Sequence, residues 1–310
     1  MSAKSCQRPA REAWLIPGPG PDERLGSVVD RAANLYGTTA DNLLAELSGG
    51  RSNTIVDADA ARPQDIVSMA RAMGVSSRAL WSHRLPDHPS LLAPGARRAM
   101  CPMCWEEDRA AGRPRAYRRD WAGVLRTTCS RHATALEFTR STAFGWDVRS
   151  DNHAIAMTEE KCVCLAAIEH FGRTLEGALF FDCPWPTHWA LSPQRARSAL
   201  LAASLNLSQE EAFPPLSRMI HPSMMTGLVR TPLHVLSPLR GPPWEAFRAI
   251  ADPMLRRAAL WLVGWWTCPE WLDAWRPDGF RGKTSELIPD QPAAVDRVAQ
   301  RLNLEVVGRF

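Results

Sequence analysis

The sequence predicts a mainly α-helical protein, and three observations along its 310 residues lead to this prediction. Apolar residues recur every three or four positions in segments before residue 85 and after residue 158, which is the period of an amphipathic helix. Glycines and prolines end these segments after short runs, as in helical hairpins. Between the two helical parts, two close pairs of cysteine and histidine residues predict a small module of another kind.

The N-terminal region predicts a first helical hairpin. Residues 1–22 are rich in proline and glycine and are expected to form an extended lead-in. A helix is expected over residues 22–37, because Gly37 is a natural stop and one face is apolar: Leu25, Val28, Val29, Ala32, Ala33 and Tyr36. The second helix begins at Thr38-Thr39, ends at Gly49-Gly50 and carries Leu43, Leu44 and Leu47.

A second hairpin has the helix, Gly-Val-Ser turn, helix arrangement of DNA-reading helix-turn-helix folds. Its first helix begins at Pro63, ends at Gly74 and has an apolar face of Ile66, Val67, Met69, Ala70 and Met73. The second helix runs through Trp81 and, in a DNA-reading fold, would present polar side chains to a groove: Ser76, Ser77, Arg78, Ser82, His83 and Arg84. The alternative is an ordinary helical hairpin, and Arg78 and Arg84 suit phosphate contacts in either case.

Four residues in the middle of the chain form two ligand pairs for a metal ion. Two residues separate Cys101 from Cys104, two separate Cys129 from His132, and 24 residues lie between the pairs. Each pair can form a tight turn whose side chains converge on one ion, as in tetrahedral Zn²⁺ sites. Four protein ligands leave no open coordination position, so the sequence predicts one structural zinc. The alternative is a chance spacing among 8 cysteines and 8 histidines.

Positive charge is concentrated around these ligand pairs. Residues 97–140 contain ten arginines and five acids, a net charge of +5, whereas the whole chain carries +4. A cationic segment favours a phosphate backbone or an acidic protein surface as its partner. Three arginines between the pairs are therefore candidate contacts to nucleic acid or to a partner protein: Arg115, Arg118 and Arg119.

The remaining residues predict a helical C-terminal domain. Helices are expected over 158–179, 192–205 and 293–304, and a rigid Pro-Trp-Pro turn over 180–186. A tryptophan cluster is typical of a core: Trp261, Trp265, Trp266, Trp271 and Trp275. No pattern assigns a role to residues 206–310. The predicted division is a helix-turn-helix-like helical domain over 1–96, a zinc-binding module over 97–145 and a C-terminal helical domain over 146–310.

A second set of possible metal ligands lies in this C-terminal part: Cys162, Cys164, Cys183 and His188. Cys162 and Cys164 fall on opposite sides of the expected helix, which disfavours a shared ion. The sequence leaves open whether they form a second site.

Several classes of protein are disfavoured. A zinc deaminase would need a His-x-Glu, and an ATPase would need a P-loop, but the chain contains neither motif. Its acid pairs are adjacent in sequence and point different ways on a helix, so no enzyme is predicted. The longest apolar run has 11 residues, whereas a membrane helix needs about 20. The N-terminus lacks a signal-peptide pattern and the other cysteines are irregularly spaced, so a cytoplasmic protein is expected.

Three ordered motifs resemble the TniQ family, the target-selection subunits of transposons that pair an integrase with an AAA+ ATPase. The first is Asp22-Glu23-Arg24-Leu25-Gly26-Ser27, before a helix containing Asp30-Arg31-Ala32-Ala33. The second is similar to the family's zinc-finger block: Cys101-Pro102-x-Cys104-Trp105-x-Glu107, Tyr117-x-Arg119-x-x-Trp121 and Cys129-x-x-His132-x-x-x-Leu136. The third is Asp182-Cys183-Pro184-Trp185-Pro186. Val28-Val29, Gly26 and Trp105 depart from the family pattern.

The resemblance implies a non-enzymatic adaptor of transposition. Such a protein binds target DNA or a guide-RNA (CRISPR) effector complex and recruits the AAA+ ATPase regulator that brings the transposase. The sequence leaves a second function open, a stand-alone zinc-containing helix-turn-helix transcriptional regulator. The aromatic-rich C-terminal third is compatible with a homodimer, and no membrane partner is expected.

Overall fold

The computed structural model describes residues 18–47, 57–142, 145–147, 159–205 and 242–268, and the expected helix over 293–304 lies outside them. The chain divides into two compact units. The N-terminal unit contains Met1–His88 and Asp108–Arg119, and the C-terminal unit contains Pro89–Glu107 and Asp120–Phe310. The three-part division expected at residues 96 and 145 remains a prediction.

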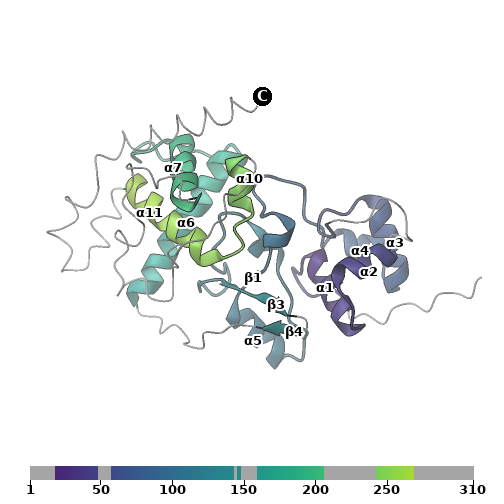
Figure 1. Ribbon diagram of the computed structural model, residues 1–310. Helices are drawn as coiled ribbons and strands as arrows, with labels where there is room; N and C mark the ends of the chain where they lie inside the picture. Colours follow the sequence, from purple (N-terminus) through teal and green to yellow (C-terminus); the bar gives the residue numbers. More distant parts are fainter. Residues whose placement is uncertain (1–17, 48–56, 143–144, 148–158, 206–241, 269–310) are drawn as a thin grey trace, which may run out of the picture. The chain divides into compact units, whose positions relative to one another are not determined.

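Up to His88, the described part of the N-terminal unit contains four short helices (Figure 1): α1 (Leu25–Leu35), α2 (Ala40–Leu47), α3 (Pro63–Met73) and α4 (Ser77–Trp81). The predicted helix stop at Gly74 and the predicted helix cap at Ser76 are both present. Gly74 adopts a left-handed φ of 67° after α3, and the Ser76 hydroxyl accepts a hydrogen bond from the amide of Ala79. The apolar faces of the four helices form one core. Val67 departs from the prediction, because its side chain is 45% exposed on α3.

Residues 22–27, the first of the three motifs described above, take part in a network of buried contacts within the N-terminal unit. The amide of Arg24 donates to the carbonyl of Tyr117, and the amide of Arg119 donates to the carbonyl of Asp22. The Arg24 guanidinium, over the ring of Tyr117, pairs with Asp59 at 2.8 Å. This motif therefore stabilises the fold, and its charged residues are not a free binding surface.

Gly26 belongs to the same network. Its amide donates to Asp59 Oδ1 at 2.6 Å. A Cβ at this position would lie 2.3 Å from Arg24 Nη1 and 3.0 Å from Asp59 Oδ1. The ion pair of Arg24 and Asp59 therefore occupies the space that a side chain at position 26 would need.

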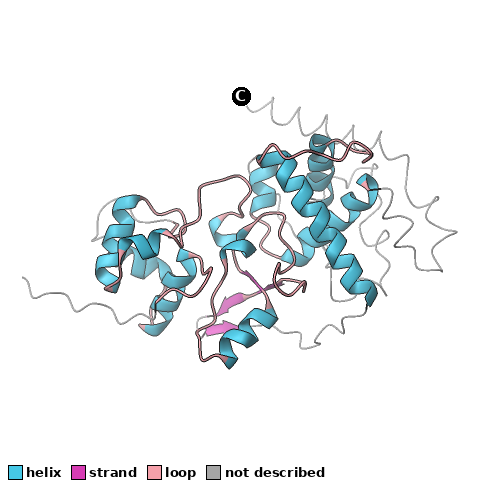
Figure 2. Cartoon of the chain, turned by 180° about the vertical axis from the view of Figure 1, so that it is seen from behind, coloured by secondary structure: helices cyan, strands magenta, loops and turns pink. Residues whose placement is uncertain are grey.

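Helices also dominate the described part of the C-terminal unit, where the strands are only two or three residues long (Figure 2). The helix α6 (Glu159–Phe180) and the helix α7 (Pro193–Leu205) agree with the predicted ranges. The other elements are η1 (Pro94–Ala96), β1 (Ala99–Met100), α5 (Pro102–Ala110), η2 (Arg119–Ala122), β2 (Glu137–Phe138), β3 (Arg140–Thr142), β4 (Gly145–Asp147), α10 (Pro243–Arg248) and α11 (Pro253–Thr267). The mainly helical fold class is confirmed.

One core unites the helices α6, α7, α10 and α11. Trp261 and Trp266 are buried in it, as expected, whereas Trp271 and Trp275 lie outside the described residues. Leu92, Val124 and Leu125 come from the segments around the ligand pairs and belong to the same core. These segments therefore pack against the helices of the C-terminal unit. Within the described ranges, no helix has the length and apolar character needed to cross a bilayer.

Candidate metal centre

The first ligand pair lies where strand β1 meets helix α5. Cys101 directly follows Met100, the last residue of β1, and Cys104 lies in the first turn of α5. Pro102 occupies the first position of this helix, where its missing N–H costs no hydrogen bond. The amide of Trp105 donates to the carbonyl of Cys101, so one helical turn brings both thiols to the same side. Both cysteines are fully buried.

A hairpin over residues 127–136 carries the second ligand pair. The amide of Leu136 donates to the carbonyl of Thr127, and the amide of Cys129 donates to the carbonyl of Thr134. The tip is a tight turn in which Ala133 has a left-handed φ of 49°. This hairpin, residues 127–136, is termed the knuckle hairpin.

The pairing of two short strands brings the two ligand pairs together. Strand β2 follows the knuckle hairpin without a break and runs antiparallel to β1, with Met100 opposite Glu137. Cys101 is the next residue after Met100, so the register places it beside the hairpin. The two ligand pairs, which are distant in the sequence, are therefore brought next to each other by this pairing.

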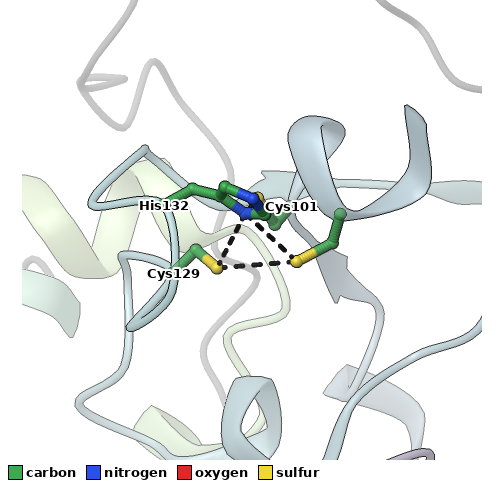
Figure 3. A group of neighbouring side chains, drawn as sticks. Cys101, Cys129 and His132 are labelled. Atoms are coloured by element: carbon green, nitrogen blue, oxygen red, sulfur yellow. Dashed lines mark hydrogen bonds between the residues drawn. The ribbon is translucent and has the colours of Figure 1, made fainter. Parts of the chain in front are cut away.

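Four ligand atoms converge at this position, from Cys101, Cys104, Cys129 and His132, and all lie within 4.8 Å of one another. Figure 3 labels three of these residues, Cys101, Cys129 and His132. The Sγ atoms of Cys104 and Cys129 are 3.8 Å apart, and His132 Nδ1 lies 3.3 to 3.7 Å from the three sulfurs. A tetrahedral ion with about 2.3 Å to sulfur and about 2.1 Å to nitrogen requires S···S distances of about 3.8 Å and S···N distances of about 3.6 Å. The quartet therefore has the shape of a closed tetrahedral metal site.

The orientation of His132 is set by residues outside the quartet. Nδ1 faces the sulfurs, while Nε2 lies 2.9 Å from Oε1 of Glu107 on helix α5. Arg131 Nη1 approaches the other carboxylate oxygen at 3.1 Å. A histidine ligand commonly donates its second ring N–H to a carboxylate, which fixes the tautomer and makes the ligating nitrogen more basic. Glu107 occupies that position here.

Three side chains of the quartet have shifted pKa values. A hydrogen bond from Cys101 lowers the pKa of Cys129 to about 4, against the opposing effect of burial. That hydrogen bond and burial together raise the pKa of Cys101. Burial lowers the pKa of His132, but Glu107 and Cys129 outweigh it, so the pKa is raised. The lowered pKa of Cys129 favours the thiolate, which is the form that binds a metal, whereas Cys101 and His132 must lose a proton when a metal binds.

Helix α6 supports the segment that leads into the knuckle hairpin. Glu169 accepts hydrogen bonds from Thr128 and, at 2.8 Å, from Arg126, which also pairs with Glu176 at 3.0 Å. A Cβ on Gly172 of α6 would lie 2.9 Å from the carbonyl oxygen of Leu125, so helix and loop backbone approach closely. Sequence reasoning missed these residues, because acids and arginines on a helix usually mark a solvated face.

The candidate DNA-contact residues of the second hairpin fall into two groups. Ser76 and Arg78 are exposed at the start of α4. His83 and Arg84 lie beyond the end of this helix and take part in the fold. His83 Nδ1 is 2.7 Å from the carbonyl oxygen of Glu23, and Arg84 Nε donates to the carbonyl of Ala61 while its guanidinium covers the ring of Trp81. The polar groups of His83 and Arg84 therefore contact the N-terminal unit itself.

The three candidate arginines between the ligand pairs belong to the N-terminal unit, whereas the quartet belongs to the C-terminal unit. Arg118 pairs with the buried carboxylate of Asp108 at 3.1 Å and donates to the carbonyl of Pro21. Arg119 is exposed, and its Nη1 donates to the carbonyl of Ser82 at 2.5 Å. Arg115 is exposed. Two of the three arginines, Arg118 and Arg119, therefore contact groups within the N-terminal unit.

The second set of cysteines does not form a comparable cluster. Cys164 is buried, whereas Cys162 and Cys183 are exposed. Within the part of the chain that the structure describes, the quartet of Cys101, Cys104, Cys129 and His132 is the only group of three or more such residues that could hold a metal ion.

The fold and the site define a mainly helical protein with a cluster of three cysteines and one histidine that could hold a metal ion. Residues 14–136 match the model of the TniQ family. These residues are therefore a TniQ domain, which confirms the resemblance predicted from the sequence. The match includes all four quartet residues and ends at Leu136, the last residue of the knuckle hairpin. No curated protein and no solved structure matches the chain. A TniQ domain indicates a target-selection role associated with transposition.

Proposed function

We propose that this protein is a non-enzymatic target-selection adaptor of a transposon, acting in the cytoplasm. It binds target DNA or a guide-RNA effector complex and recruits an AAA+ ATPase regulator, which in turn brings the transposase. The observation that carries the proposal is the TniQ domain together with the closed quartet inside it.

The metal in this proposal is a structural Zn²⁺ ion held by Cys101, Cys104, Cys129 and His132. The distances within the quartet suit zinc, and three thiols with one imidazole are a common structural zinc set. Bound zinc would supply a crosslink between β1, α5 and the knuckle hairpin. Four protein ligands leave no position for a substrate or water, which agrees with an adaptor without catalysis.

An exposed surface on helix α4, here called the α4 surface, is the proposed contact region. It comprises Ser76, Ser77, Arg78, Trp81 and Ser82, which are all exposed, together with Arg119, bonded to the carbonyl of Ser82. The side chain of Trp81 is 46% exposed and lies in the same helix as the exposed Arg78. Arginine beside an exposed aromatic ring suits nucleic acid, since the guanidinium binds phosphate and the ring can stack.

The alternative function, a stand-alone transcriptional regulator, is less well supported by this surface. Helix α4 has only five residues, and both His83 and Arg84 are used within the N-terminal unit. A groove-reading helix normally offers three or four side chains to base edges. The α4 surface is better suited to phosphate contacts, which position a protein on nucleic acid but do not specify a sequence.

A reconstitution with purified components tests the proposal. The full chain is mixed with an AAA+ ATPase of the transposition-regulator class, ATP and DNA, and recruitment is measured by sedimentation and by gel shift. We expect a stable complex that requires the ATPase, and weaker recruitment by Arg78→Ala and Trp81→Ala. Arg71→Ala, which removes an exposed arginine from α3, is the matched control and should behave like the wild type. Tight binding to one short palindrome without the ATPase would support the regulator instead.

A further inference from the structure

Two neighbouring arginines on helix α11, Arg256 and Arg257, contact the metal-binding segment from outside the family match. Both side chains are fully buried. Helix α11 begins at Pro253, more than a hundred residues beyond the end of the TniQ match at Leu136. The function proposed above gives these residues no role.

Arg257 closes the open end of the knuckle hairpin. Its Nη2 donates to the carbonyl of Thr127 at 2.6 Å and to the carbonyl of Leu136 at 2.9 Å. Thr127 and Leu136 are the first and last residues of the hairpin and are hydrogen-bonded to each other. One nitrogen therefore holds both arms at the base, while Cys129 and His132 lie at the tip.

Arg256 holds the backbone that enters the hairpin. Its Nη1 donates to the carbonyls of Gly123, Val124 and Arg126, at 3.2, 2.8 and 3.1 Å. A single guanidinium nitrogen thus satisfies three carbonyls of one turn. Together the two arginines fix the backbone on both sides of Thr127.

These contacts matter because the charges are buried. Burial lowers the pKa of Arg256 to about 9 and that of Arg257 to about 10, while Asp252 opposes the shift, so both remain cations at neutral pH. A buried cation is tolerated only when its donors find acceptors. Five carbonyls of residues 123–136 supply acceptors for Arg256 Nη1 and Arg257 Nη2. The two that bind Arg257, from Thr127 and Leu136, lie side by side only when the hairpin is formed.

We propose that Arg256 and Arg257 are positioning residues of the metal centre, and that helix α11 and the knuckle hairpin form a single cooperative unit. The arginines fix the hairpin so that Cys129 and His132 face Cys101 and Cys104. Metal binding in turn keeps the carbonyl acceptors in place for the arginines. Helix α11 thereby becomes part of the metal site. This gives a role to a segment that lies beyond the family match. This inference rests on the metal binding proposed above.

Zinc affinity of the full-length chain tests the proposal. Arg257→Met removes the donors and the charge but keeps an apolar side chain of similar length in the core. We expect its zinc affinity, measured by competition with a chromophoric chelator, to fall about 10-fold, the lower end of the range for residues that orient metal ligands. The matched control is Leu262→Met, which places the same new side chain on a buried position of α11. The control should bind zinc like the wild type.

Unchanged zinc affinity in Arg257→Met would overturn the proposal, and so would an equal loss in Leu262→Met, since that loss would reflect core packing alone. Hydrogen exchange on the wild-type chain provides a second test that needs no variant. When zinc is removed by a chelator, amides over residues 123–136 and 253–267 should lose protection together, while helix α3 of the N-terminal unit stays protected.

Loss of protection confined to residues 123–136 would also overturn the proposal. The failure of the proposed function is distinguishable from these outcomes. A wild-type chain that binds no zinc would remove the metal itself, whereas a zinc-binding chain without coupling would remove only the role of Arg256 and Arg257.

Discussion

At the scale of the residue, Glu107 shows how one carboxylate outside the quartet controls the metal site. It accepts from His132 Nε2 and leaves Nδ1 to face the sulfurs. Arg131 holds the second oxygen of the carboxylate. The helix α5 that carries Cys104 thus also orients the ligand from the knuckle hairpin.

We predict that Glu107→Ala weakens zinc binding by about 10- to 100-fold, because the imidazole loses the acceptor that fixes its tautomer and ring orientation. Chelator competition measures the affinity. Glu106→Ala is the matched control, since it removes the same charge from a neighbouring exposed position of α5 and should leave the affinity unchanged. Equal effects of the two substitutions would show that Glu107 acts only through overall charge.

Gly26 provides a second prediction at this scale. In Gly26→Ala the new methyl group must displace the Arg24 guanidinium from Asp59, so the N-terminal unit should lose about 1–3 kcal/mol of its free energy of unfolding. Denaturant unfolding measures the change. Gly18→Ala is the control, because a Cβ at Gly18 would meet no atom within 4 Å. A stability of Gly26→Ala equal to that of the control would contradict the proposed steric role.

At the scale of the element, the segment 108–119 connects to the helices of the N-terminal unit through its charged residues. The buried Asp108 carboxylate accepts from both Arg113 and Arg118, and Arg118 also reaches the carbonyl of Pro21. The arginines of this segment therefore differ in what they do, although they look alike in the sequence.

We predict that Arg118→Ala destabilises the N-terminal unit by about 2 kcal/mol, because Asp108 is left with fewer charge-assisted hydrogen bonds. Arg115→Ala, at an exposed position, should change the free energy of unfolding by less than about 0.5 kcal/mol. Denaturant unfolding of the two variants side by side checks this difference. Should both variants unfold like the wild type, the pair with Asp108 contributes no stability, and loss of binding in Arg118→Ala can be assigned to the partner contact.

At the scale of the whole molecule, the metal centre depends on helices far along the chain. Glu169 of α6 bonds to Thr128 and Arg126, and Arg257 of α11 bonds to the base of the knuckle hairpin. Val124 and Leu125, just before the hairpin, belong to the core of these helices. The quartet is therefore assembled by the packing of the entire C-terminal unit.

We accordingly predict that a chain truncated after residue 142 fails to retain zinc, although it contains the whole family match and all four ligands. Without α6 and α11 the hairpin lacks its supporting contacts, and its apolar residues have no core to join. Elemental analysis after gel filtration, compared with the full chain, measures the metal content. A folded truncated chain with one zinc would show that the segment is autonomous after all.

The sequence by itself determined the helices of the N-terminal unit, α6, α7 and the identity of the quartet. These features depend on local patterns, since helix faces follow a short period and each ligand pair has its two members within three residues of each other. Only the tertiary structure decided that Arg256 and Arg257 are buried clamps, that Gly26 makes room for the pair of Arg24 and Asp59, and that His83 and Arg84 take part in the fold. In the sequence a buried arginine looks the same as an exposed one, because its role depends on which carbonyls and carboxylates packing brings near from distant parts of the chain.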